Sequence, residues 1–168
     1  MATLSMNYRS LDPKADWEFF DPDLAAPAST LACIHPLTEE SAIALWREFI
    51  SQDADHPMQL SDQAWPSQLY ASPARADWQT DWNDDAATGF AEWLRVSLPW
   101  PPDISVVFTH SSSWSIETSW EVFLGCWRNF LFADEGPFLW SLQQPQAVGF
   151  SPAGFACVGH RSPFVIAT

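Results

Sequence analysis

The most strongly patterned stretch of the chain runs from Trp114 to Trp140. Within it, five large apolar side chains recur at the i, i+3, i+4, i+7 and i+11 positions of a helix: Trp120, Phe123, Leu124, Trp127 and Leu131. Small polar residues precede this stripe, and Gly136-Pro137 follows it. Because a stripe of this period forms one apolar face on a helix, we predict a central helix that begins near Trp114 and packs on a sheet.

Short apolar runs flank this predicted helix. Residues 104–109 precede it as a β-branched run, and residues 138–142, 147–150 and 155–159 follow it as three further strands separated by short turns. The order is strand, helix and three-strand meander. We therefore predict an α+β fold in a single domain over residues 1–168, with an antiparallel sheet and helices packed on one of its faces.

The first hundred residues give weaker predictions. Thr38 followed by two glutamates is typical of a helix N-terminus, and the apolar spacing then predicts a helix over residues 39–52. Residues 17–20 read as a short strand and residues 53–73 as a loop. Residues 74–98 read as one or two helices, in which acidic residues lie beside tryptophans.

The composition is rich in aromatic rings and acidic groups. The chain has 11 Trp, 12 Phe and 2 Tyr, enough large side chains to build a core. Its formal net charge is −14, and residues 1–100 carry 16 acidic and 5 basic side chains. A field of this sign repels phosphate backbones and anionic lipids, so we expect neither a nucleic-acid nor a membrane partner. It would attract a basic protein; the alternative is that the charge serves solubility alone.

Neither a leader nor a membrane span is apparent, since the first nine residues lack an apolar region and no later apolar run is long enough. Cys33, Cys126 and Cys157 are odd in number and widely spaced, which argues against a disulfide framework. We therefore expect a cytoplasmic protein, with Cys126 as a packed thiol and with Cys33 and Cys157, which lie in apolar runs, in the core.

The sequence contains no recognisable catalytic motif. Cys126 lies in the predicted helix with nothing nearby to lower the pKa of its thiol, and no serine stands in a Gly-x-Ser-x-Gly turn. The histidines are not paired at ligand spacing, and the run from Asp53 to His56 lacks the other ligands of a calcium loop. We expect no catalytic residue, no metal and no cofactor.

One enzymatic alternative stays open. Glu117 and Glu121 are four residues apart on the predicted helix, and Asp134 and Glu135 follow it. Two such carboxylates in different environments around a cleft could act as acid and base. A small enzyme is therefore the alternative to a binding protein.

The central stretch resembles small bacterial proteins grouped as a family of unknown function. The resemblance is carried by Ser115-Ile-Glu-Thr-Ser-Trp-Glu-Val-Phe-Leu, by Cys126-Trp-Arg-Asn-Phe-Leu-Phe-Ala-Asp-Glu-Gly-Pro and by the ending Gly159-His-Arg161. The same stretch is similar to single-domain immunity proteins of contact-dependent or secreted toxin systems. This resemblance implies an α+β protein that neutralises a toxin in the cytoplasm by tight binding.

The acidic residues next to tryptophans are the predicted contact surface for a basic partner. The residues assigned to this surface are Asp77, Trp78, Asp81, Trp82, Asp84 and Asp85, with Asp53 and Asp55 as neighbours. An exposed Trp78 or Trp82 would be the central contact, because tryptophan within a polar rim is typical of binding hot spots. The alternatives are that both tryptophans pack inward, or that the chain is a housekeeping interaction protein without a toxin partner.

Overall fold

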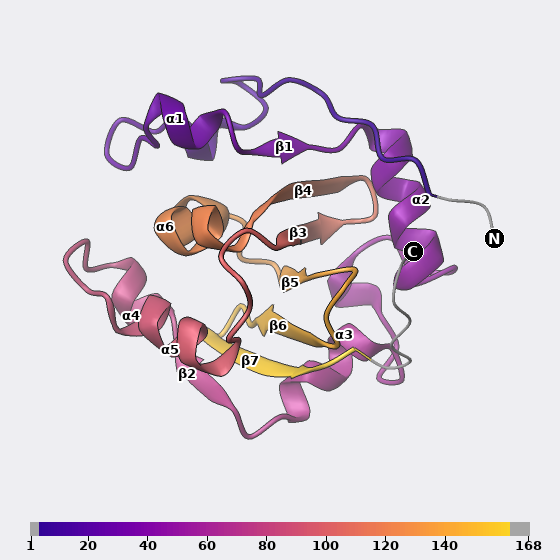
Figure 1. Ribbon diagram of the computed structural model, residues 1–168. Helices are drawn as coiled ribbons and strands as arrows, with labels where there is room; N and C mark the ends of the chain where they lie inside the picture. The colour runs from indigo at the N-terminus through magenta and orange to yellow at the C-terminus, as the bar shows by residue number, and fades with distance from the viewer. Residues whose placement is uncertain (1–3, 162–168) are drawn as a thin grey trace.

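The computed structural model of the chain describes residues 4–161 and contains one sheet of seven strands. The strands are β1 (His35–Pro36), β2 (Arg75–Asp77), β3 (Ser105–Ser111), β4 (Trp114–Ser119), β5 (Phe138–Trp140), β6 (Gln146–Phe150) and β7 (Phe155–His160). Every neighbouring pair is antiparallel, in the order β1-β4-β3-β5-β6-β7-β2 (Figure 1). The predicted α+β class with a single antiparallel sheet is confirmed, and so are the strands corresponding to β3, β5, β6 and β7.

Short helices connect the strands. The α-helices are α1 (Ala28–Leu31), α2 (Glu39–Phe49), α3 (Trp65–Gln68), α4 (Gln79–Trp82), α5 (Gly89–Ser97) and α6 (Trp120–Phe130). Three single turns of 3-10 helix are η1 (Trp17–Phe19), η2 (Pro57–Gln59) and η3 (Leu69–Ala71). The predicted helix over 39–52 is confirmed as α2, and Thr38 caps it by accepting the backbone N–H of Ser41. The predicted loop 53–73 contains three of these short elements.

The helices lie on both faces of the sheet, so the prediction of a single covered face is wrong. One core joins α5, α6, η1 and Trp78 to one face, whereas a second core joins α2 and α3 to the other (Figure 1). Successive strand residues alternate between the two cores: Val106 and Phe108 belong to the first, and Val107 belongs to the second. The inner strands are apolar on both faces, and each face therefore needs its own cover.

The central stretch is a strand followed by a helix. Residues 114–119 form β4, which pairs with β3 around a turn at Ser112 and Ser113, and the helix begins only at Trp120. The predicted start near Trp114 was wrong because this hairpin turn contains no glycine or asparagine to signal it. Glu117, expected in a first helical turn, instead lies on β4 and accepts a hydrogen bond of 2.9 Å from the Tyr8 hydroxyl.

Two more elements differ from the prediction. Residues 17–19 form η1 and not a strand, because Phe19 turns inward and packs edge-on against Phe130 at 5.0 Å between ring centroids. Residues 75–77 form the edge strand β2, whose polar sequence gives no strand signal. The rest of the predicted 74–98 helical region is α4 and α5.

Ser119 caps α6 and provides a simple test of the observed boundary. Its hydroxyl accepts the backbone N–H of Val122 at 3.3 Å. We expect Ser119→Ala to lower the free energy of unfolding by about 1 kcal/mol, as for other N-caps, measured by urea denaturation. Ser61→Ala, at an exposed side chain without a cap bond, should leave the free energy of unfolding unchanged. An equal effect of the two substitutions would contradict the cap.

Candidate functional site

The acidic segment, residues 77–88, runs from the end of β2 through α4 to the start of α5. Three of its carboxylates, on Asp77, Asp81 and Asp84, accept hydrogen bonds from backbone N–H groups of the same segment or of α5. Asp77 accepts the backbone N–H and the hydroxyl of Thr80, at 2.9 and 2.8 Å, and the backbone bond is the main reason that the pKa of Asp77 is lowered. Asp81 accepts the N–H of Phe90 at 2.7 Å and so binds the first turn of α5. The segment is therefore folded around α4, and it leaves Asp84 and Asp85 exposed.

Arg128 on α6 holds the acidic segment in place. Its guanidinium donates to three backbone carbonyls: to Asp81 at 3.1 and 2.8 Å, to Asp84 at 2.7 Å and to Ala87 at 2.9 Å. All of these bonds go to carbonyl oxygens, and Arg128 forms no ion pair with a carboxylate among residues 4–161. Asp85 makes no hydrogen bond or ion pair with any residue in the range 4–161 and is exposed. The segment thus presents negative charge on a fixed backbone.

The two predicted tryptophans pack inward. Trp78 is only 3% exposed and belongs to the first core. Trp82 is half-buried, and its indole N–H donates to the carbonyl of Arg128 at 2.9 Å. Trp78 is therefore unavailable as the central contact of a surface, because it closes the core beneath α4. Trp82, being half-buried, can offer only part of its ring to a partner.

Trp17 is an exposed tryptophan that was not among the predicted contact residues. It is 49% exposed on η1, and its ring lies 5.0 Å from the ring of Phe132. Phe132 in turn lies 5.0 Å from Trp82. We call Trp17, Phe132 and Trp82 the aromatic strip; it leads from η1 past the end of α6 to the acidic segment. The available signal was that Trp17 stands between two acidic residues, Asp16 and Glu18.

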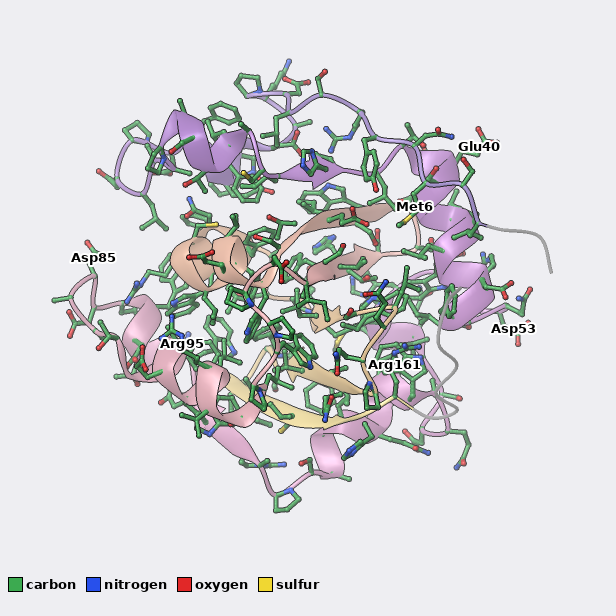
Figure 2. The ribbon with its side chains drawn as sticks, viewed as in Figure 1. Met6, Glu40, Asp53, Asp85, Arg95 and Arg161 are labelled. Atoms are coloured by element: carbon green, nitrogen blue, oxygen red, sulfur yellow. The ribbon has the colours of Figure 1, made fainter. Side chains whose placement is uncertain are left out.

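Asp53 and Asp55 do not join this surface. They follow α2, which covers the opposite face of the sheet, and Figure 2 shows Asp53 and Asp85 at opposite sides of the molecule. Asp55 is also paired with Arg47, at 2.5 Å between Oδ1 and Nη2. The prediction that residues 53–55 lie beside residues 77–85 is therefore wrong. The sheet separates the two acidic stretches, and their distance along the sequence does not indicate this.

The candidate catalytic groups do not converge. Cys126 is buried, its thiol donates to the carbonyl of Val122, and burial raises its pKa to about 12. Cys33, expected in the core, is exposed. Within residues 4–161 no three His, Cys, Asp or Glu side chains are placed to hold a metal ion. In the same range no helix is both long and apolar enough to cross a membrane.

Among residues 4–161, Glu18 is the carboxyl whose pKa is raised by a large amount. It is 4% exposed and lines a gap, too narrow for a water-sized molecule, together with His110, Trp114 and Phe130. Burial raises the pKa of Glu18 to about 7 and, with neighbouring His56, lowers the pKa of His110. A pair of groups with shifted pKa values can mark an active site. The gap beside Glu18 has no room for a substrate. The shifted pKa of Glu18 therefore reflects its burial next to Trp17 and does not mark an active site.

The sequence matches a known protein family over most of its length. Residues 8–159 match the family described as a protein of unknown function, DUF2947. The chain belongs to the DUF2947 family. No curated protein and no solved structure matches it. For this DUF2947 protein, the resemblance to a family of unknown function is confirmed over nearly the whole chain. The similarity to immunity proteins stays a prediction.

Proposed function

We propose that this DUF2947 protein acts by binding a basic protein partner, and that it does so without catalysing a reaction. The proposed contact surface combines the aromatic strip with the exposed carboxylates of the acidic segment. The partner class that we propose is the toxic domain of a bacterial toxin, neutralised in the cytoplasm by occlusion. The resemblance of residues 104–161 to immunity proteins supports this class.

The observation that carries the proposal is the half-exposed Trp17 beside a fixed acidic loop. Tryptophan is enriched in binding hot spots, where a polar rim surrounds it and excludes water. The Trp17 ring packs against the Phe132 ring. Because this contact already restricts the Trp17 side chain, the side chain loses little conformational entropy when a partner covers it. This arrangement differs from scattered exposed apolar residues, which are normal on any protein surface.

Charge supplies the second part of the argument. The net charge of −14 would accelerate the approach of a basic partner, and the exposed carboxylates of Asp84 and Asp85 would select its orientation. Because Arg128 already orders the backbone at residues 81–87, the acidic segment need not fold when it binds. Preorganisation of this kind favours slow dissociation, which occlusion of a toxin requires.

Binding can be tested with the protein encoded by the gene immediately upstream, using its C-terminal domain as the titrant in calorimetry. We expect Trp17→Ala and, separately, Asp84→Lys with Asp85→Lys each to weaken binding by about tenfold or more, equivalent to about 1.4 kcal/mol. The affinity of the unaltered protein should fall as salt rises, since exposed charges are screened.

Glu48→Lys with Asp53→Lys is the matched control for the charge reversal. It makes the same change in net charge on α2 and the loop after it, on the opposite side of the sheet. We expect an effect below about threefold, because charges more than a Debye length from the contact are largely screened. Equal losses in the two double variants would mean that only total charge matters, and the assigned surface would be wrong.

A further inference from the structure

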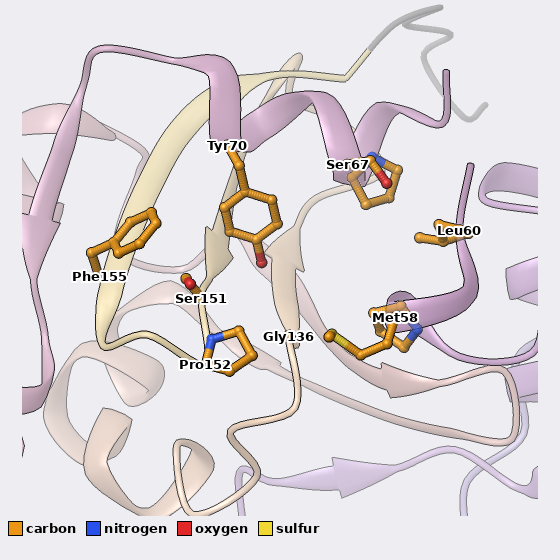
Figure 3. Close-up of a pocket in the computed structure, with 10 residues that line it drawn as sticks. Met58, Leu60, Ser67, Tyr70, Gly136, Ser151, Pro152 and Phe155 are labelled. Atoms are coloured by element: carbon orange, nitrogen blue, oxygen red, sulfur yellow. The ribbon is translucent and has the colours of Figure 1, made fainter. Parts of the chain in front are cut away.

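A pocket of about 390 Å³ opens on the sheet face covered by α3 (Figure 3). It is bounded by η2, by α3 with η3, by the turn between β6 and β7, and by the approach to β5. The lining residues are Pro57, Met58, Leu60, Pro66, Ser67, Tyr70, Gly136, Ser151, Pro152 and Phe155. They share no residue with the aromatic strip or the acidic segment, so the pocket is separate from the proposed binding surface. Its volume lies in the range of small-molecule sites.

Proline and glycine residues shape the walls of this pocket. Prolines restrict the backbone φ angle on three sides of the pocket. Because the lining has fewer conformations to lose, less entropy is lost when a ligand binds. Gly149 on β6 lets the Tyr70 ring lie against the sheet: a Cβ there would come within 3.1 Å of Tyr70 Cζ. Gly136 has a φ of +79°, which places the chain against Met58 and Pro57 in a conformation that other residues rarely adopt. The space is thus preformed.

Tyr70 provides the main polar group. Its hydroxyl points into the space between Pro152 and Met58 (Figure 3) and makes no hydrogen bond with the residues that the structure describes. Burial raises the pKa of Tyr70, so the group is a neutral phenol that can donate or accept one hydrogen bond. The remaining polar side chains are Ser67 and Ser151, and the Ser151 hydroxyl already accepts the N–H of Ala153.

The charge of the lining limits the ligand. None of the lining side chains is acidic or basic, so a charged group entering the pocket would lose water without gaining a counter-ion. The net charge of −14 further disfavours anions. We propose that this pocket binds an uncharged small molecule with an aromatic or aliphatic body and one hydrogen-bonding group, which meets the Tyr70 hydroxyl. Met58, 66% exposed at the rim, adapts its flexible side chain to the ligand.

Two fluorescent dyes that differ in charge test this proposal on the full chain. N-Phenyl-1-naphthylamine is uncharged, and 8-anilinonaphthalene-1-sulfonate carries a sulfonate on nearly the same skeleton. Titrated with direct excitation of the dye, the neutral compound should bind with a stoichiometry of one and at least about tenfold more tightly than the sulfonate. Tyr70→Phe should weaken the neutral compound by about threefold to tenfold. Equal affinity for the two dyes, or no saturable binding, would overturn the proposal.

A variant and a spectroscopic measurement locate the dye. Ser67→Trp should fill the pocket and abolish binding of the neutral dye, whereas Ser113→Trp, in the exposed hairpin turn, should leave binding unchanged. Circular dichroism establishes that both variants fold. In the unaltered protein, the methyl resonance of Met58 should shift on titration while that of Met6 does not. An unchanged affinity of a folded Ser67→Trp, or an unmoved Met58 resonance, would contradict the assigned site.

Discussion

Glu18→Gln should make the protein more stable at pH 8 by about 3 kcal/mol and leave its stability at pH 4.5 nearly unchanged. The substitution keeps the size of the side chain and removes its charge. Burial raises the pKa of Glu18 from its ordinary 4.5 to about 7, so folding favours the protonated carboxyl. Each unit of difference between the folded and unfolded pKa values corresponds to about 1.4 kcal/mol in the free energy of unfolding, so this difference corresponds to about 3 kcal/mol.

The sign of this effect follows from proton binding. Between pH 4.5 and 7 the folded chain holds a proton on Glu18 that the unfolded chain has released, so stability falls as pH rises through this window. The loss is complete about one pH unit above the pKa of the folded state. His110, whose pKa burial lowers, acts in the opposite direction because the unfolded chain binds its proton more readily. The difference between variant and unaltered protein at each pH therefore isolates Glu18.

Urea denaturation from pH 4.5 to pH 8 measures this difference. Glu121→Gln, at an exposed carboxylate on α6, is the matched control and should give a flat difference. A flat difference for Glu18→Gln as well would mean that the carboxyl reaches water in the folded protein.

Arg128→Ala is expected to have the second large effect. It removes hydrogen bonds to three carbonyls and the contact of the guanidinium with the Trp127 ring at 4.7 Å. We expect a loss of about 2–3 kcal/mol in the free energy of unfolding, because bonds to charged groups are stronger than average but not additive. Amide hydrogen exchange over residues 81–90 should accelerate more than elsewhere. Partner binding should weaken even though Arg128 would not touch the partner.

Two further variants define the role of Arg128. Arg128→Lys keeps the charge and loses the planar fork, so it should recover only part of the stability. Arg95→Ala removes an exposed arginine of α5 that pairs with Glu92 on the surface, and it should change stability by no more than about 0.5 kcal/mol. Unchanged exchange over residues 81–90 in Arg128→Ala would show that the acidic segment is ordered by other contacts.

Local patterns explain which parts of the fold could be predicted. The Thr38 cap and the stripe on α6 are set by residues three and four apart, and the apolar runs of β5, β6 and β7 are bounded by clear turns. The polar edge strand β2 and the glycine-free β3–β4 turn carry no such signal. The covering of both faces of the sheet could not be predicted either. It depends on contacts between segments far apart in the sequence, such as the pairing of β1 with β4.

The candidate surface could be predicted only in part for the same reason. Acidic residues at 77–85 are visible as a cluster in sequence, and they remain together because α4 and its loop are contiguous. Trp17 reaches the same region through Phe132, more than a hundred residues later, and no local pattern links them. Asp53 and Asp55, predicted as neighbours of this cluster, follow α2 and lie on the opposite side of the sheet.

Protection of cells from the upstream gene's C-terminal domain tests the central claim most directly. That domain would be expressed from an inducible promoter together with this protein, and survival would be counted. We predict protection by the unaltered chain and by the Glu48→Lys, Asp53→Lys control. We predict loss of protection when Trp17→Ala is combined with Asp84→Lys and Asp85→Lys, at equal folded abundance. Full protection by that triple variant, or none by the unaltered protein, would contradict the account.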